Sequence, residues 1–373
     1  MVDPAYPPAR TAAAIVTDFF ARRVQAAATA REWPWVPDAD TVTAVVDAAF
    51  WASLRREEGR PPRVSLAILA PEYAGQPMLF ERTLPLTADP LVRLAPAVER
   101  PGIHLGIWRS TEGELRIWGA VRELPDFCLV TEVVEPGLLV LKYQREKDQK
   151  YGNIAVLRGD QIRVVEDADG AMPRRPAMLS ALLGADGLVS WNDGGSLLTQ
   201  LAVSMRGHGH GAALLVVPGG TDAWRESIVQ PTAYPIVPAF GGLAELLDRR
   251  QDEAVADDIR VLVDAIAGLT AVDGAAILSH RFELLAFGAT IRRREGHRPV
   301  EQVIVTEPVA GDVPSRVPVT ELGGTRHLSA AQFVHDQRDA LAFVASQDGR
   351  FTLFAWSAKK ATVHAHRIEV LLL

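Results

Sequence analysis

Apolar side chains recur at helical spacing in two segments near the beginning of the chain. In residues 9–30 and again in residues 39–57, apolar residues stand three or four positions apart and polar residues occupy the positions between them. This spacing is typical of helices that bury one face. Gly59 and the pair Pro61-Pro62 follow the second segment, and such residues end helices. We therefore expect a pair of helices here.

From residue 63 to residue 166 the spacing of apolar residues changes to that of strands. Short apolar runs are separated by turn residues such as Ser110–Gly113, Glu135-Pro136 and Gly159-Asp160, a pattern typical of antiparallel hairpins. The sequence therefore predicts an antiparallel meander after the helical pair. The predicted strands are 64–69, 103–109, 114–120, 128–134, 137–143, 153–158 and 161–166.

The middle of the chain returns to helical spacing and then reaches a short loop of alternating glycine and histidine. This loop carries His208 and His210. Two imidazoles beside free backbone N–H groups could bind a metal or a phosphate, and could then act as an accessory to a nearby site. A glycine-rich connection between a helix and a strand is the simpler interpretation. The predicted elements around the loop are helices at 177–184 and 195–206 and a strand at 212–217.

A passage rich in proline and glycine, residues 230–242, suggests a boundary between domains. Its first part, residues 234–237, could also form a strand. We expect an N-terminal α+β region over residues 1–238 and a separate C-terminal domain over residues 239–373. A length of 373 residues fits two domains.

Helices alternate with strands after this passage, which predicts an α/β fold in which helices flank a mixed sheet. The predicted elements are a helix at 242–268, strands at 272–279, 283–289 and 302–306, a loop at 307–327, a helix at 328–339 and strands at 341–346, 351–356 and 362–371.

Composition narrows the classes of protein to which the chain can belong. Hydrophobic residues make up 48% of the chain, which excludes disorder as its main state. A formal net charge of −7 argues against bulk nucleic-acid binding, because phosphate neutralisation needs an excess of basic residues. The single cysteine, Cys128, allows no intramolecular disulfide. Since no apolar run is long enough to cross a bilayer, we expect a cytoplasmic protein that does not enter membranes.

Two short motifs about 50 residues apart carry the candidate chemistry. The first is Asp273-Gly274-Ala275, and the second, Thr325-Arg326-His327, stands where a loop enters a helix. Helix N-terminal N–H groups beside an arginine form an anion site, and a threonine at that position can cap the helix. Each motif also has an ordinary structural interpretation: a solvated or paired carboxylate for the first, and a capped helix with a surface arginine for the second.

Taken together and in this order, the motifs resemble the diadenylate cyclase domain shared by the DNA-integrity-scanning and membrane-type enzymes that make cyclic di-AMP. That family has an Asp-Gly-Ala motif, then Gly-Thr-Arg-His-Arg entering a helix, then a strand ending near Val-Ser-Gln. The resemblance covers roughly residues 255–360 of this chain. The region that precedes it resembles the DACNV group, relatives of the cyclase domain that are proposed nucleotide sensors.

The resemblance implies a ligand, a metal and a set of site residues. ATP or a related (cyclic) nucleotide is the expected ligand, with Mg²⁺ or Mn²⁺ needed if the chain is catalytic. Asp273 would then be the catalytic residue and a metal ligand, and Asp348 a second metal ligand. The residues expected to bind the nucleotide are Asp273, Gly274, Ala275, Gly288, Thr325, Arg326, His327 and Ser329.

One departure from the family pattern bears directly on activity. Leu328 stands where the family has its second arginine, so one cation for the triphosphate is missing. A hydrogen bond to a charged group contributes about 1.5–3 kcal/mol, and its loss could stop turnover while leaving binding. Four arginines downstream of the predicted strand 283–289 are candidates to supply this cation: Arg292, Arg293, Arg294 and Arg298.

Three functional hypotheses follow. The first is a nucleotide-binding sensor that signals through a separately encoded effector protein. The second is an active diadenylate cyclase, in which two ATP-bearing protomers of a homodimer face each other. The third is a structural or interaction protein that binds no nucleotide.

Overall fold

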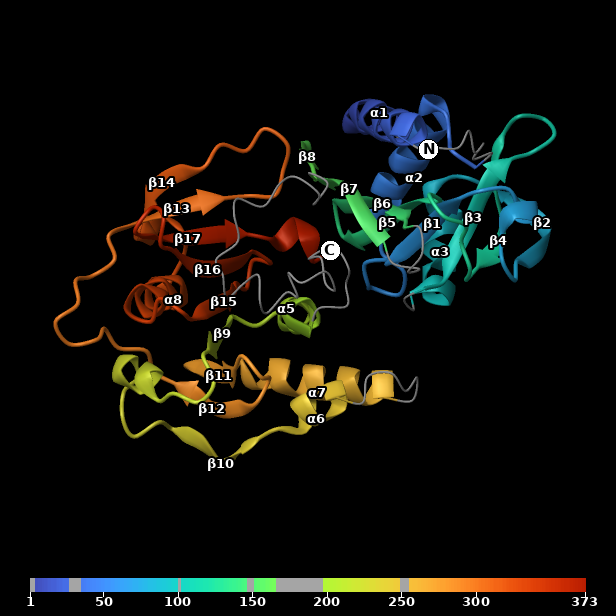
Figure 1. Cartoon of the computed structure of the whole chain (residues 1–373). Coiled ribbons are helices and arrows are strands. Elements are labelled where there is room, and N and C mark those ends of the chain that lie inside the picture. The colour runs from blue at the N-terminus through green and yellow to red at the C-terminus, as the bar shows by residue number, and fades with distance from the viewer. Residues whose placement is uncertain (1–3, 27–34, 100–101, 146–150, 166–196, 249–254) are drawn as a thin grey trace. The chain divides into compact units, whose positions relative to one another are not determined.

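The computed structural model describes residues 4–26, 35–99, 102–145, 151–165, 197–248 and 255–373, and the chain divides into two compact units (Figure 1). The boundary between the units lies between residues 167 and 168, earlier than the boundary expected after residue 238. The reason is that the strands at 212–217 and 234–240 hydrogen-bond within the C-terminal sheet. The passage rich in proline and glycine therefore belongs to a folded unit.

The N-terminal unit consists of helices packed on an eight-stranded sheet. Its elements in chain order are α1 (Pro8–Ala26), α2 (Ala39–Ser53), β1 (Val64–Ile68), a short 3₁₀ helix (Pro71–Tyr73), β2 (Met78–Pro85), α3 (Ala88–Val98), β3 (His104–Arg109), β4 (Leu115–Val121), β5 (Leu129–Glu135), β6 (Leu138–Gln144), β7 (Tyr151–Arg158) and β8 (Gln161–Val164).

The strand order in this sheet is β2-β4-β3-β1-β5-β6-β7-β8. Only β1 and β3 pair in parallel; every other neighbouring pair is antiparallel. Strands β5 to β8 run as the meander that the sequence predicts, and the hairpin of β3 and β4 is also confirmed. The α+β character of the N-terminal unit is thus as expected.

A strand and a helix between residues 78 and 98 were not predicted from the sequence. Strand β2 lies at the edge of the sheet, and most of its side chains are exposed, so it lacks the apolar alternation of a half-buried strand. Helix α3 contains Pro96 in its interior, and a proline there normally argues against a helix. Strand β2 is stabilised by its pairing with β4, and α3 by the burial of its apolar face. The local sequence predicts neither element.

A buried histidine gives the N-terminal unit a predicted pH dependence. The ring nitrogens of His104 lie 2.7 Å from Ser65 Oγ and 2.8 Å from Tyr151 OH. Burial lowers the pKa of His104 to about 4; Lys142 adds to this effect and Glu132 opposes it. Below pH 6.5 the unfolded chain therefore takes up a proton that the folded unit does not. Stability is fully present above pH 6.5 and falls until the pH reaches about 4.

We expect the free energy of unfolding to drop by about 1 kcal/mol between pH 6.5 and pH 5.5 through this histidine alone. Denaturant titrations at the two pH values, on the wild type and on His104→Gln, measure it. The variant should lose that share of the pH dependence even if it is less stable throughout. Equal pH dependence in both proteins would contradict the prediction.

The C-terminal unit is a nine-stranded mixed sheet with helices on both faces. Its elements are α5 (Leu197–Gly207), β9 (Ala212–Val217), a 3₁₀ helix (Ala223–Ser227), β10 (Tyr234–Phe240), α6 (Gly242–Asp248), α7 (Val255–Leu269), β11 (Ala275–Ser279), β12 (Leu284–Ala289), β13 (Gln302–Thr306), β14 (Ser315–Pro318), a 3₁₀ helix (Val319–Glu321), α8 (Thr325–Asp336), β15 (Leu341–Ala345), β16 (Phe351–Ser357), β17 (Thr362–Arg367) and a last 3₁₀ helix (Glu369–Leu371).

The strand order in this sheet is β10-β12-β11-β9-β15-β16-β17-β13-β14, with parallel pairing of β9 to β11 and of β13 to β17. One hydrophobic core lies between the sheet and helices α5, α6 and α7. A second core lies between the opposite face and α8 (Figure 1). This layered arrangement is the α/β fold that the sequence predicts, with a mixed sheet flanked by helices.

Most elements of the C-terminal unit fall near the positions that the sequence predicts, with several differences in their bounds. Strand β11 begins only at Ala275, so Asp273 precedes the strand. The expected loop at 307–327 contains β14, and α8 begins three residues earlier than expected. The expected helix at 242–268 is described as α6 and α7, and the helix expected at 177–184 lies outside the described residues.

The two edges of this sheet differ in character. Strand β10 contains Pro235 and Pro238 and exposes apolar side chains: Val237 is 88% exposed and Tyr234 51%. Strand β14 has only four residues, among them the exposed Arg316.

In the described part of the chain, no helix is long and apolar enough to cross a membrane.

Candidate functional site

A cavity of about 730 Å³ lies at one end of the C-terminal sheet, and both sequence motifs line it. Its volume is within the range of about 300–1,000 Å³ that is usual for small-molecule sites. The residues that line it are Gly211, Ala213, Asp273, Gly274, Ala275, Ala289, Thr290, Ile291, Gly324, Thr325, Arg326, His327, Ser329, Val344, Ala345, Ser346, Gln347 and Asp348.

The strand topology explains why segments so far apart in sequence meet here. Strands β9 and β11 are parallel neighbours and both begin at this end of the sheet. Their other neighbours, β15 and β12, are antiparallel to them and therefore end there. The register pairs Ala212 with Ala345 and Ala275 with Ala289. Four adjacent strands thus contribute their ends to one cavity, and the N-terminus of α8 completes it.

Gly274 holds the loop before β11 against the end of β12. Its φ of +102° is rarely adopted by residues with a side chain. A Cβ added to Gly274 would lie only 2.6 Å from the carbonyl carbon of Gly288. Gly288 does not line the cavity, in contrast to its expected contact with the nucleotide. Instead, a Cβ added to Gly288 would lie 2.7 Å from the Tyr234 ring, so this glycine makes room for that side chain. The missing side chain of Gly274 allows the close approach of the two backbones, and the exposed Asp273 beside it lines the cavity.

The second motif forms the N-terminus of α8. Gly324 is the N-cap and provides no side-chain cap, and Thr325 is the first helical residue. The interpretation of Thr325 as the capping residue is therefore wrong. The first N–H groups of a helix have no intrahelical partner, and an uncapped start leaves them available to an anion. Thr325 and Ser329 both line the cavity beside them.

Arg326 is the one arginine among the described residues that line the cavity. Its Nε is buried and has no hydrogen-bond partner in the described part of the chain. Its guanidinium lies over Gly211, where an added Cβ would come within 2.8 Å of Nη1. Gly211 was not identified from the sequence as a site residue. The lack of a side chain there makes room for the arginine.

His327 lies deeper, only 3% exposed, with no hydrogen-bond partner for Nε2 among the described residues. Burial lowers its pKa below the ordinary value; Arg367 and Arg350 add to this effect and Asp348 opposes it. The imidazole is therefore neutral at physiological pH. A neutral ring can donate one hydrogen bond and accept another, which suits a ligand with oxygen and nitrogen atoms.

Asp348 lies on the loop after β15 and also faces the cavity. Its carboxylate accepts from Arg350 N at 3.3 Å and forms an ion pair with Arg350 Nε at 3.4 Å. Asp273 and Asp348 are both exposed. Carboxylate oxygens that remain open to solvent are the donors that Mg²⁺ and Mn²⁺ prefer, so the expected metal ligands fit such an ion chemically.

Leu328 does not face the cavity, because its side chain packs on the core beneath α8. The four downstream arginines do not replace the missing cation, since none of them lines the cavity. Arg292 Nε donates to the Glu226 carbonyl at 3.1 Å, and the Arg294 guanidinium pairs with the Glu226 carboxylate at 2.6 Å.

His208 and His210 lie outside the cavity lining as well. Their rings are 5.6 Å apart, and the backbone N–H of His210 donates to His208 Nδ1 at 3.1 Å. This contact fits a turn between α5 and β9. The structure does not bring the two imidazoles together with the other predicted site residues.

A family model matches part of the chain. Residues 32–122, in the N-terminal unit, match a family described as the probable sensor domain DACNV, which confirms that resemblance for this region. No curated protein matches the chain.

Two solved structures are similar to part of the chain. A hypothetical membrane spanning protein from Bacillus cereus is 14% identical over 46% of this chain and 63% of its own, with a TM-score of 0.27. A double-cysteine variant of DacA from Staphylococcus aureus is 13% identical over 45% of this chain and 83% of its own, with a TM-score of 0.24.

Proposed function

We propose that the C-terminal unit binds an adenine nucleotide, ATP or a related cyclic nucleotide, and that the chain is a nucleotide-responsive sensor. The observation that carries the proposal is the cavity: both motifs of the cyclase-like pattern line it, together with the uncapped N-terminus of α8. The match of residues 32–122 to a probable sensor domain supports the sensing role.

Different cavity residues would bind different parts of the ligand. The first N–H groups of α8 and the Arg326 guanidinium would hold the phosphates. Ser329 and the neutral His327 would add hydrogen bonds. Asp273 and Asp348 would hold Mg²⁺ or Mn²⁺, which when bound neutralises phosphate charge. Gly274 lets the ligand approach the backbone before β11.

An active diadenylate cyclase is the second candidate function, and the preserved position of Asp273 at the cavity favours it. Leu328 favours the sensor instead. With that side chain packed on the core, Arg326 is the only arginine that lines the cavity in the parts of the chain that the structure describes. Phosphoryl transfer depends on positioning and charge neutralisation, so one missing cation affects turnover more than binding.

We expect purified full-length protein to bind ATP and leave it unconverted. The measurement is incubation with ATP and Mn²⁺ or Mg²⁺ at high protein concentration, followed by liquid chromatography and mass spectrometry, with calorimetry for binding. Asp273→Asn is the matched control. Cyclic di-AMP that forms with the wild type and disappears with this variant would make the chain a cyclase. If neither ATP nor cyclic di-AMP binds saturably, the remaining hypothesis is a structural or interaction protein that binds no nucleotide.

A further inference from the structure

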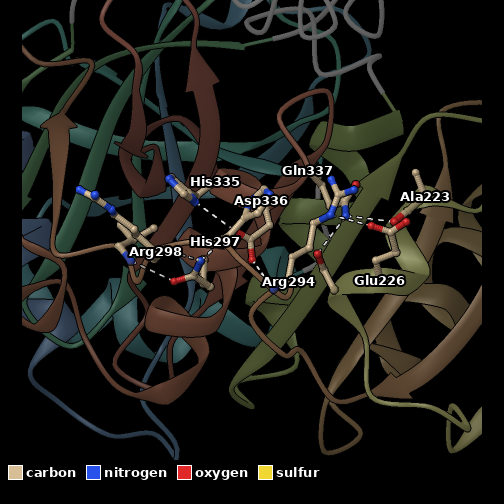
Figure 2. Close-up of polar contacts among 11 residues, drawn as sticks. Ala223, Glu226, Arg294, His297, Arg298, His335, Asp336 and Gln337 are labelled. Carbon is tan, nitrogen blue, oxygen red and sulfur yellow. Dashed lines mark hydrogen bonds and ion pairs between the residues drawn. The ribbon is translucent and has the colours of Figure 1, made fainter.

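A second cluster of metal-ligating side chains lies at the opposite end of α8 from the cavity. His297 belongs to the segment between β12 and β13, and His335 and Asp336 are the last two residues of α8 (Figure 2). Potential ligand atoms of the three lie within 4.8 Å of one another. Among the described residues, this is the only group of three or more His, Cys, Asp or Glu side chains with that property.

The Asp336 carboxylate has more neighbours than hydrogen bonding alone accommodates. The Nδ1 atoms of His297 and His335 each lie 3.0 Å from Oδ1, and Gln332 Nε2 lies 2.9 Å from the same oxygen. A carboxylate oxygen offers about two lone-pair sites. Three N–H donors on one oxygen exceed that number. A cation shared by the two ring nitrogens and Oδ1 relieves the excess, because each imidazole then presents a lone pair instead of a proton.

The distances from Asp336 Oδ1 to the two ring nitrogens suit a first-row transition metal. Zinc lies about 2.0–2.2 Å from imidazole nitrogen and carboxylate oxygen. Two ligands at that distance, about 90–110° apart as seen from the ion, are separated by about 3.0–3.4 Å. The separation of 3.0 Å from Oδ1 to each Nδ1 is within that range.

Further contacts hold the carboxylate in place. The Asp336 side chain is fully buried, and its Oδ2 accepts from the backbone N–H of Arg294 at 2.8 Å. Gln332 is fixed in turn, since its Oε1 accepts from Val300 N at 2.9 Å. Outer contacts of this kind orient ligands in metal sites. The Arg294 guanidinium pairs with Glu226 (Figure 2), so its charge is already balanced.

We propose that His297, His335 and Asp336 bind a divalent first-row transition metal ion of the zinc class. The ligand atoms are the two Nδ1 atoms and Asp336 Oδ1. The His297 and His335 side chains are 30% and 24% exposed, which admits water to the remaining coordination position. Two imidazoles and one carboxylate plus water form a known donor set for zinc.

Such an ion would join two segments that also reach the cavity. The segment that carries His297 follows Thr290 and Ile291, which line the cavity, and α8 carries Arg326 and His327 at its other end. The helix is about 17 Å long at 1.5 Å per residue. The metal site is therefore separate from the nucleotide site, and it fixes the end of the helix on which that site depends.

The test uses the full-length protein after removal of metal by a chelator, with Zn²⁺ and Co²⁺ as probes. We expect one Zn²⁺ per chain in a calorimetric titration, a Zn²⁺-dependent rise in melting temperature, and a visible Co²⁺ absorption spectrum. His297→Ala and His335→Ala should each weaken Zn²⁺ binding by more than the roughly 10–100-fold typical of losing an outer-shell partner. Circular dichroism establishes that each variant is folded.

The matched control is the double variant His208→Ala/His210→Ala, which removes another close pair of histidine rings. It should keep full Zn²⁺ stoichiometry and affinity. The proposal is overturned if the wild type takes up no stoichiometric Zn²⁺, as in a purely hydrogen-bonded cluster. It is also overturned if the double variant loses the binding while His297→Ala keeps it. The wild-type titration and the Co²⁺ spectrum decide the question even if a variant does not fold.

Discussion

Replacing Arg326 with alanine should weaken ATP binding by about 10- to 150-fold while leaving the fold intact. Among the described residues, Arg326 is the only arginine that lines the cavity, and its Nε has no hydrogen-bond partner there. No folded-state hydrogen bond of that nitrogen is therefore lost with it. A hydrogen bond to a charged group contributes about 1.5–3 kcal/mol, which corresponds to this range of affinity. Isothermal titration calorimetry with ATP measures the change.

Arg316→Ala is the matched control for charge, because Arg316 is exposed on β14 and does not line the cavity. Both variants remove one positive charge from the unit, so a general electrostatic effect would appear in both. ATP affinity should be unchanged in this control. Equal affinities of the wild type and the Arg326 variant would place the phosphates elsewhere and contradict the proposed mode of binding.

Gly274→Ala should destabilise the C-terminal unit and distort the cavity at the same time. The residue has a φ of +102°, and an added Cβ would lie 2.6 Å from the backbone of Gly288. Backbone strain of this kind costs about 1–3 kcal/mol, and forced overpacking costs a further 1–3 kcal/mol or so. We expect the free energy of unfolding to fall by roughly 2–6 kcal/mol, and ATP binding to be lost as the loop with Asp273 moves.

Gly207→Ala isolates the effect of adding a methyl group. Gly207 ends α5, has no positive φ, and an added Cβ there meets no heavy atom within 4 Å. Denaturant titration should give the control the stability of the wild type or slightly more. If Gly274→Ala unfolds at the same denaturant concentration as the control, the close contact between the Gly274 and Gly288 backbones is not needed for stability.

The motif residues of the site could be predicted from the sequence because each motif is contiguous. Asp273, Arg326 and His327 all line the cavity. Ser346 and Gln347, at the strand end near which the family has Val-Ser-Gln, also line it. Gly211 lines it as well, and the register of β9 against β15, which pairs Ala212 with Ala345, brings it beside them.

Two further features of the structure could not be predicted from the local sequence, because they depend on contacts between distant segments. His297 and His335 are 38 positions apart in the sequence, and only the tertiary fold brings their rings together. The resemblance implies a nucleotide contact for Gly288, but this glycine does not line the cavity, and a Cβ there would lie 2.7 Å from the Tyr234 ring.

The fold was predictable where one face of an element is buried and less so elsewhere. The meander of β5 to β8 has mostly buried strands with turn residues between them, so periodicity identifies it. The passage at 230–242 misled the prediction of the boundary, because proline and glycine mark linkers and edge strands alike. Strand β10 is such an edge: its pairing with β12, which the sequence does not reveal, makes it part of the C-terminal unit.

The edges of the nine-stranded sheet also bear on aggregation. An exposed, apolar edge strand is a template on which another chain can add a strand, and β10 presents Val237, Tyr234 and Phe240 to solvent. Two of its seven residues are prolines, which have no N–H to donate to an incoming strand. The opposite edge, β14, is short and carries a charge. The sheet can therefore leave apolar side chains open to solvent without growing edge to edge into fibrils.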